Sequence, residues 1–150
     1  MDESQLLADF RAKFRVDELL IAKTPAWSWS LRPGQATLAA GVLSLNRYAA
    51  SFAEVSAAEM AELAVLVGQL ERAVKAAFDY DRINYLMLMM VDHHVHFHVI
   101  PRYQGLRQFA GLDWVDGGWP AVPVLSVSQH QDQPELLLKI REALGSACGS

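Results

Sequence analysis

The sequence predicts an α+β fold with one mostly antiparallel sheet of about five strands, one long central helix and short terminal helices. Three observations lead to this fold class. A capping box followed by apolar residues at helical spacing predicts the long helix at 57–78. Short stretches of extended character lie before and after this helix. The last two stretches lie so close together that only a hairpin, and therefore an antiparallel pair, can join them.

Length and composition suit one folded domain over residues 1–150. Hydrophobic residues make up 52% of the chain and charged residues 20%, which excludes a disordered or low-complexity protein. The formal net charge of −4 argues against a nucleic-acid partner, because phosphate backbones need clustered positive charge. The single cysteine, Cys148, rules out an internal disulfide and fits a reducing compartment.

No sequence signal for a membrane or for export is present. The longest apolar run, at 85–91, is far shorter than the ~20 residues that a membrane-spanning helix needs. The chain begins Met-Asp-Glu-Ser, with two acidic residues where a signal peptide carries basic ones. We therefore expect a soluble, cytoplasmic protein with no membrane partner.

The N-terminal third is predicted to form one helix, a short apolar run and two extended stretches. Apolar residues at three- and four-residue spacings over 4–16 indicate an amphipathic helix. Large side chains alternate with serines at Trp27–Leu31, which is typical of a half-buried strand. The second extended stretch lies at about 37–45, and the turn at 32–35 joins it to Trp27–Leu31. Residues 19–22 form the short apolar run.

The second half of the chain begins with the most clearly marked helix. Ser56 and Glu59 form the capping box, and Ala57–Phe78 carries the helical repeat. Two strands then follow at Arg82–Met90 and His94–Pro101, with a tight turn at Asp92–His93. The segment from 103 to 131 is predicted to be a long connection, and a terminal helix is predicted from Pro134 to Leu144.

Three histidines alternate with apolar residues near the start of the last predicted strand. Side chains two apart on a strand share a face, so His94, His96 and His98 should line one side of the sheet. A solvated histidine-rich face is one interpretation. A metal site is another, although no Asp or Glu lies between His98 and Asp113 to complete a ligand set. Nucleophilic catalysis by an imidazole is the interpretation that we favour.

The run from His94 to Ile100 has the form His-φ-His-φ-His-φ-φ, where φ is apolar, and Pro101-Arg102 follows it. It resembles the signature of the histidine triad (HIT) superfamily of nucleotide hydrolases and transferases. The resemblance extends over about 19–103 and leaves a C-terminal extension at 104–150. It implies a HIT-like domain that forms a homodimer and binds a small-molecule nucleotide, either a nucleoside phosphoramidate or a dinucleoside polyphosphate.

The resemblance also implies a role for each histidine. His96 would attack the α-phosphorus and form a covalent nucleotidyl-histidine, which water then hydrolyses. His94 would hold the imidazole array in its working tautomer by hydrogen bonding. His98 would contact phosphoryl oxygens and assist the leaving group. The covalent step would need no metal and no cofactor.

Two departures from the family pattern affect the substrate contacts. Many family members carry a Gly-Gln-Ser/Thr stretch before the triad, where this chain has Met-Met-Val-Asp-His at 89–93. Tyr48 stands where the family often has a further histidine. Candidate substrate contacts are Arg102, Asn84 and Tyr48. A non-catalytic nucleotide-binding module and a histidine-ligated metalloprotein remain as alternatives.

Overall fold

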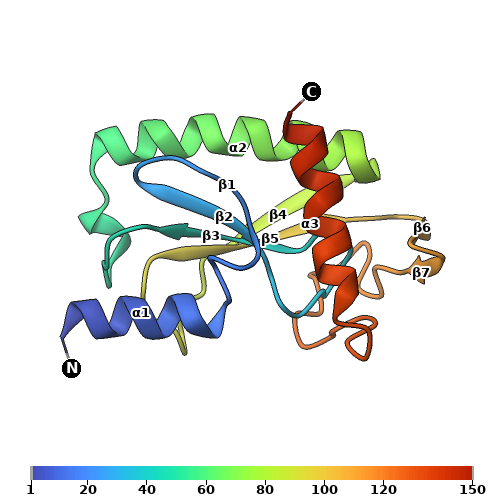
Figure 1. Cartoon of the computed structure of the whole chain (residues 1–150), viewed down its shortest axis with the longest axis horizontal. Helices are drawn as coiled ribbons and strands as arrows, with labels where there is room; N and C mark the ends of the chain where they lie inside the picture. The colour runs from blue at the N-terminus through green and yellow to red at the C-terminus, as the bar shows by residue number, and fades with distance from the viewer. Residues whose placement is uncertain (1, 150) are drawn as a thin grey trace.

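The computed structural model describes residues 2–149, which form three α-helices, one 3₁₀ turn and seven strands (Figure 1). In chain order the elements are α1 (Glu3–Lys13), β1 (Leu20–Lys23), β2 (Trp27–Leu31), β3 (Gly41–Leu45), η1 (Phe52–Glu54), α2 (Ala57–Phe78), β4 (Arg82–Leu86), β5 (His96–Arg102), β6 (Arg107–Phe109), β7 (Leu112–Trp114) and α3 (Glu135–Cys148).

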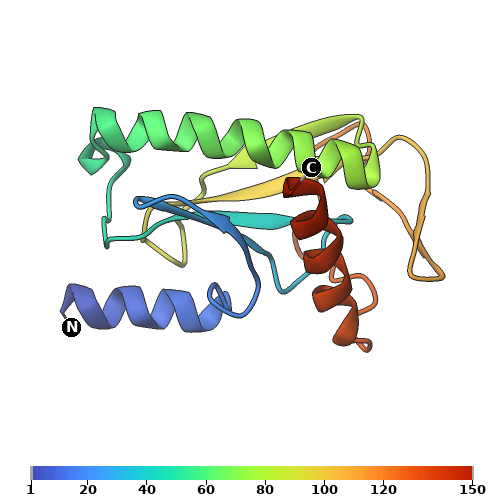
Figure 2. The same ribbon diagram turned by 45° about the horizontal axis from the view of Figure 1, so that its top comes forward.

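A five-stranded sheet forms the centre of the structure, with strand order β1-β2-β3-β5-β4. Each neighbouring pair is antiparallel. Strands β6 and β7 form a separate small hairpin. Figures 1 and 2 show α2 along one face of the sheet and α1 on the opposite side, with α3 near one end. The predicted α+β class and five-stranded antiparallel sheet are thus confirmed.

The two faces of the sheet carry different side chains. Directly paired residues of an antiparallel sheet share a face. The buried residues Trp27, Trp29 and Leu43 belong to the main core, together with residues of α2 and α3. On the other face Ser44 pairs with His96, and Val42 pairs with His98. Val42 belongs to a second, smaller cluster with Phe10, Phe14 and Val16, so α1 covers this face.

Helix α2 has the predicted bounds because its end signals are local. The Ser56 side chain accepts a hydrogen bond from the Glu59 N–H, and the Glu59 side chain accepts one from the Ser56 N–H. The helix ends at Phe78, and the next residue, Asp79, has a φ of 51° in the left-handed region. Its inward face contributes buried side chains to the main core: Leu63, Leu66, Leu70, Ala73, Val74 and Phe78.

The tight hairpin predicted at Asp92–His93 is wrong. Strand β4 ends at Leu86 and β5 starts at His96, so residues 87–95 form a longer connection, which we call the pre-triad loop. Met89 has a φ of 50°, which a strand does not allow, and Met90 is 81% exposed. The predicted strand at 37–45 is also shorter, because Ala39 has a φ of 70° and regular pairing starts at Gly41.

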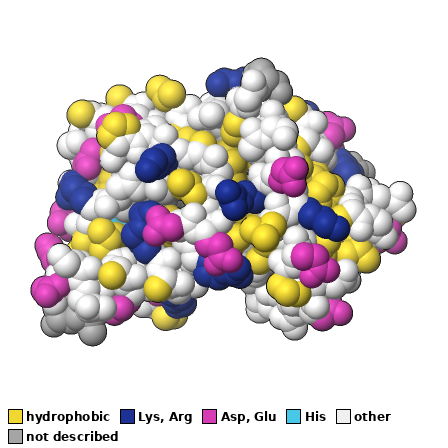
Figure 3. Space-filling model, in the orientation of Figure 1, with side chains coloured by type: hydrophobic (Ala, Val, Ile, Leu, Met, Phe, Trp, Pro, Cys, Tyr) yellow, Lys and Arg dark blue, Asp and Glu magenta, His cyan; other side chains and the backbone are white. Residues whose placement is uncertain are grey.

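Figure 3 shows positive and negative side chains interspersed on the face viewed in Figure 1, without a broad patch of one sign. Among residues 2–149, no helix is long and apolar enough to cross a membrane.

Candidate active site

The three triad imidazoles lie beneath α1. His96 and His98 are on β5, whereas His94 precedes the strand by two residues. The His96 and His98 ring centroids are 5.1 Å apart. The Phe10 ring lies 4.9 Å from His94 and 5.0 Å from His96, and the Phe14 ring lies 5.7 Å from His96 and 6.0 Å from His98. The two phenylalanines therefore form an aromatic cover over the triad.

Both ring nitrogens of His94 are bonded to the backbone. Nδ1 accepts a hydrogen bond from the Ala49 N–H at 3.3 Å, and Nε2 donates one to the Leu45 carbonyl at 2.8 Å. These two partners fix the neutral tautomer protonated at Nε2. Burial lowers the pKa of His94 below its ordinary value, which agrees with a neutral ring. His94 thus ties the start of β5 to the segment that follows β3.

One ring nitrogen of His96 forms a hydrogen bond to the backbone, and the other has no such partner within residues 2–149. Its Nδ1 donates to the carbonyl oxygen of His94 at 2.6 Å, so the lone pair is on Nε2. Burial also lowers the pKa of His96, and only 2% of the residue is exposed. The group of His94 that sets this tautomer is its backbone carbonyl. A neutral imidazole with a free Nε2 is the reactive form of a histidine nucleophile.

His98 lies beside His96 in a half-buried position. Burial lowers its pKa to about 4, with further lowering by the neighbouring His96 and Arg32. Within residues 2–149, three buried polar side-chain atoms lack a hydrogen-bond partner: Nδ1 of His98 and the Oγ atoms of Ser30 and Ser44. All three residues are on the sheet face that α1 covers, since Ser44 pairs with His96 and Ser30 pairs with Val42.

A cavity of about 340 Å³ reaches His96 and His98 from one side of α1. Its wall consists of Arg32, Lys13, Phe14, Leu125 and residues 88–92 of the pre-triad loop. A smaller cavity of about 200 Å³ lies against His94 and Tyr48. Lys13 and Asp92 line both cavities and form an ion pair with Nζ–Oδ2 at 2.8 Å. Asp92 therefore binds α1 instead of pointing at a substrate phosphate.

Tyr48 packs on the triad from the side of the smaller cavity. Its ring stacks on His94, with centroids 5.4 Å apart and planes 19° apart. Tyr48, which stands where the family often has a further histidine, therefore supports the orientation of His94. Arg32, directly after β2, is a cation that lowers the pKa of His98, but its Nη1 and Nη2 donate to the carbonyls of Gly34 and Leu125.

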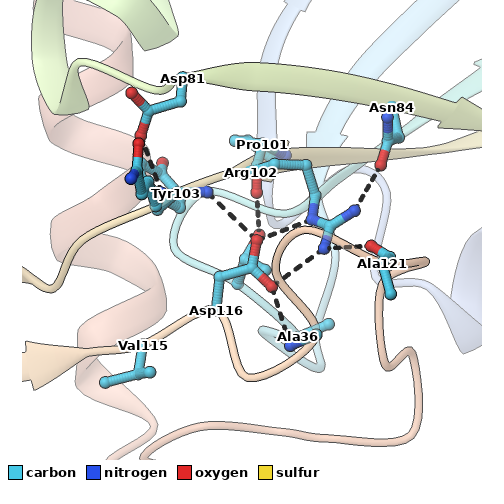
Figure 4. A network of polar contacts seen from close by, with 12 residues as sticks. Ala36, Asp81, Asn84, Pro101, Arg102, Tyr103, Val115, Asp116 and Ala121 are labelled. Carbon is cyan, nitrogen blue, oxygen red and sulfur yellow. Dashed lines mark hydrogen bonds and ion pairs between the residues drawn. The ribbon is translucent and has the colours of Figure 1, made fainter.

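Arg102 and Asn84 lie outside the cavity at His96 and bind each other (Figure 4). The Arg102 Nε is 2.7 Å from Asp116 Oδ2, Nη1 donates to Asn84 Oδ1 and Nη2 donates to the Ala121 carbonyl. The side chains of Arg102 and Asp116 are only 5% and 1% exposed. This guanidinium therefore anchors the C-terminal extension to β5. Arg102 and Asn84, which were expected to contact the substrate, do not line the cavity at His96.

The sequence did not predict the aromatic cover, nor that residues 88–91 line the cavity beside His96. Phe10 and Phe14 belong to the apolar repeat over 4–16, and their four-residue spacing gives no indication that they pack on histidines. As for the metal interpretation, no group of three His, Cys, Asp or Glu side chains within the described range 2–149 is arranged to hold an ion.

Comparison with known proteins identifies the fold. No protein-family model matches the sequence, and no curated protein does. A hypothetical histidine triad nucleotide-binding protein from Sulfolobus tokodaii is similar in structure, with a TM-score of 0.64 at 20% identity over 95% of this chain and 92% of that one. A Hit-like protein involved in cell-cycle regulation from Bartonella henselae gives a TM-score of 0.62 at 16% identity, covering 92% and 94%. A Zn-bound histidine triad family protein from Mycobacterium smegmatis gives 0.60 at 16% identity, covering 92% and 93%. The chain therefore has the fold of histidine triad proteins.

Proposed function

We propose that the protein is a nucleotide hydrolase or nucleotidyl transferase that acts at an α-phosphorus through a covalent nucleotidyl-histidine on His96. One observation carries this proposal: His96 Nδ1 donates to the His94 carbonyl, so the Nε2 lone pair is free beside a cavity. The name of the Sulfolobus neighbour, a histidine triad nucleotide-binding protein, supports a nucleotide as the ligand.

The reaction proceeds in two displacements. His96 Nε2 attacks the α-phosphorus, the bond from phosphorus to the leaving group breaks, and the leaving group departs with that electron pair and takes up a proton. Water then attacks the same phosphorus and the bond to Nε2 breaks. This step releases a nucleoside monophosphate, returns the neutral imidazole and passes one proton to solvent. A transferase uses another nucleophile in place of water.

Charge on the substrate alters the protonation of His98. In the free protein its lowered pKa keeps the ring neutral at pH 7. A phosphate anion beside the ring stabilises the protonated form and raises the pKa, so the complex gains a proton that His98 can pass to the leaving group. The depressed pKa of His96 keeps its Nε2 unprotonated at the same pH.

The first test follows the covalent intermediate. The wild-type protein is mixed with an adenosine 5′-phosphoramidate, quenched in base and examined by intact-mass and peptide mass spectrometry. We expect an adenylyl group on His96, and we expect His96→Gly to lose both the adduct and at least about 10³-fold in kcat, as enzymes do without their nucleophile. His93→Asn, at an exposed histidine three residues away, is the matched control and keeps both.

Two outcomes would replace this proposal with an alternative. Nucleotide binding without an adduct or turnover would indicate a non-catalytic binding module. Full turnover by His96→Gly would show that another group attacks the phosphorus. Metal analysis of the protein purified without an affinity tag tests the metalloprotein alternative, which predicts activity in proportion to the amount of bound ion.

A further inference from the structure

Lys13 and Asp92 form their ion pair beside the proposed nucleophile. Lys13 is the last residue of α1, and its Nζ lies 3.0 Å from Asp92 Oδ1 and 2.8 Å from Asp92 Oδ2. Both residues line the cavity of about 340 Å³ that reaches His96 and His98. Burial has the largest effect on the pKa of both imidazoles, and among the smaller effects Asp92 raises and Lys13 lowers each pKa. An anion and a cation are therefore paired within electrostatic reach of the reacting groups.

Lys13 is the cation of this cavity wall that a phosphate can recruit. The other cation is Arg32, which donates from Nη1 and Nη2 to the carbonyls of Gly34 and Leu125. The Lys13 ammonium has hydrogen bonds to Asp92 alone within residues 2–149, and 53% of its side chain is exposed. Lys13 can therefore leave its partner without breaking a hydrogen bond to the backbone.

The pre-triad loop places a carboxylate where the wall needs a phosphate donor. Its side chains from 88 to 91 are apolar and donate no hydrogen bond, and the residue that follows them in the wall is Asp92. Carboxylate and phosphate oxygens both accept charge-assisted hydrogen bonds from an ammonium group. The Asp92 carboxylate thus uses the N–H groups of Lys13 that a phosphate would need.

We propose that Lys13 binds the phosphate group of the substrate, and that Asp92 opposes this binding by holding Lys13 in the free protein. This inference rests on the proposed function and adds a regulatory contact to the same site. An arriving phosphate displaces the Asp92 carboxylate and receives the N–H groups of Lys13, which releases α1 from the pre-triad loop. No covalent bond changes in this exchange. Asp92 acts as an internal competitor, so the affinity for a nucleotide is reduced by the fraction of molecules in which Lys13 is held.

Binding of AMP tests this competition without requiring turnover. Its Kd is measured by isothermal titration calorimetry for the wild type, Asp92→Asn, Lys13→Met and the double variant. Asp92→Asn frees the ammonium and removes a like charge, so we expect Kd to fall about threefold or more, as for charge pairs near the surface. Lys13→Met removes the ammonium but keeps an unbranched side chain, so Kd should rise by about the same factor. In the double variant the gain from Asp92→Asn should be at least about twofold smaller, because no lysine remains to be released.

Two controls separate the exchange from general effects of charge. Lys75→Met and Asp79→Asn make the same changes in a surface ion pair at the end of α2, where Nζ–Oδ1 is also 3.0 Å. Neither should change the Kd of AMP. Adenosine, which has no phosphate, should bind all these proteins alike.

Three results would overturn the inference. If Asp92→Asn and Lys13→Met both weaken AMP binding, the pair only holds α1 in place. If their effects on the free energy of binding add in the double variant, the two charges act independently and Asp92 does not withhold Lys13. If AMP binds neither the wild type nor Asp92→Asn, Lys13 does not hold a nucleotide phosphate.

The adduct on His96 is measured separately, so the two proposals can fail independently. An adduct on His96 together with any of these three results leaves the nucleophile proposal standing and removes the role of Lys13. The expected changes in Kd without an adduct support the exchange between Asp92 and the phosphate and refute the covalent mechanism.

Discussion

Among single residues, His98 links the proposed chemistry to the stability of the fold. Its pKa is about 4 in the folded protein, mainly because of burial, against an ordinary value near 6.5 for an unfolded chain. Between these two values the unfolded chain binds more protons than the folded one. The free energy of unfolding therefore falls as the pH is lowered from about 6.5 towards 4, by at most about 1.4 kcal/mol per pH unit for one proton.

Denaturant unfolding measured at intervals from pH 7 to pH 4.5 checks this pH dependence. We expect His98→Asn to show a shallower loss of stability than the wild type, because its side chain cannot titrate. His94 and His96 also have lowered pKa values, so part of the slope remains. The exposed His93→Asn serves as the control. A slope that is identical in His98→Asn and the wild type would show that His98 is not responsible.

Asp116 has a structural role that makes a second residue-level prediction. Its carboxylate accepts hydrogen bonds from Arg102 Nε, the Tyr103 N–H and the Gly118 N–H, and it is almost fully buried. Asp116→Ala leaves the guanidinium buried without a counter-charge, so we expect the free energy of unfolding to fall by about 3–5 kcal/mol.

Chemical denaturation measures this loss. Glu18→Ala is the comparison, because it breaks an ion pair with Arg15 at the surface, where such pairs contribute little. If Asp116→Ala were no more destabilising than Glu18→Ala, the pair with Arg102 would not hold the C-terminal extension in place.

At the scale of elements, α1 is the least firmly attached part of the candidate site. Its apolar contacts come from a small cluster separate from the main core. The ion pair between Lys13 and Asp92 ties its last turn to the pre-triad loop, with both Lys13 and Asp92 partly open to water. This helix also covers the sheet face of Ser30, Ser44 and His98, whose buried polar atoms without a partner contribute no hydrogen bond to its attachment.

Lys13→Met should therefore loosen α1 without unfolding the protein. The ion pair is near the surface, so we expect hydrogen exchange of the backbone amides at 6–14 to rise by up to about fivefold. Lys75→Met is a matched control on α2, since Lys75 is 55% exposed and Lys13 is 53% exposed. Equal exchange at 6–14 in Lys13→Met and the wild type would mean that the ion pair does not hold the helix.

The same elements show which structure can be predicted from sequence. Helix α2 was predicted to its final residue because the capping box and its apolar repeat are local signals. The spacing of His96 and His98 correctly placed both on one face of a strand. The prediction for residues 87–95 was wrong, and local signals do not show long-range contacts such as the one between Asp92 and Lys13, 79 residues earlier in the chain. In the same way, only tertiary packing shows that Asp116 binds Arg102 or that α1 covers the triad.

For the molecule as a whole, α3 joins the C-terminal extension to the main core. Ile140 and Leu144 are fully buried, and α3 contacts both α2 and β1. The predicted single domain over 1–150 requires that the sheet and this extension unfold together. If they do, a cavity made in α3 lowers the stability of the sheet as well, because a domain that unfolds in one cooperative transition has a single free energy of unfolding.

Ile140→Ala tests this by removing a buried side chain from α3, at an expected cost of about 2–5 kcal/mol. Unfolding is followed by far-ultraviolet circular dichroism for the helices and by tryptophan fluorescence for the sheet, in a Trp114→Phe, Trp119→Phe background that keeps only the buried Trp27 and Trp29. Both signals should move to lower denaturant together. Leu138→Ala changes a residue of the same helix that is 47% exposed, and it should move neither by much. A fluorescence transition that stays at its wild-type midpoint while the dichroism changes early would divide the chain into two independently folding parts.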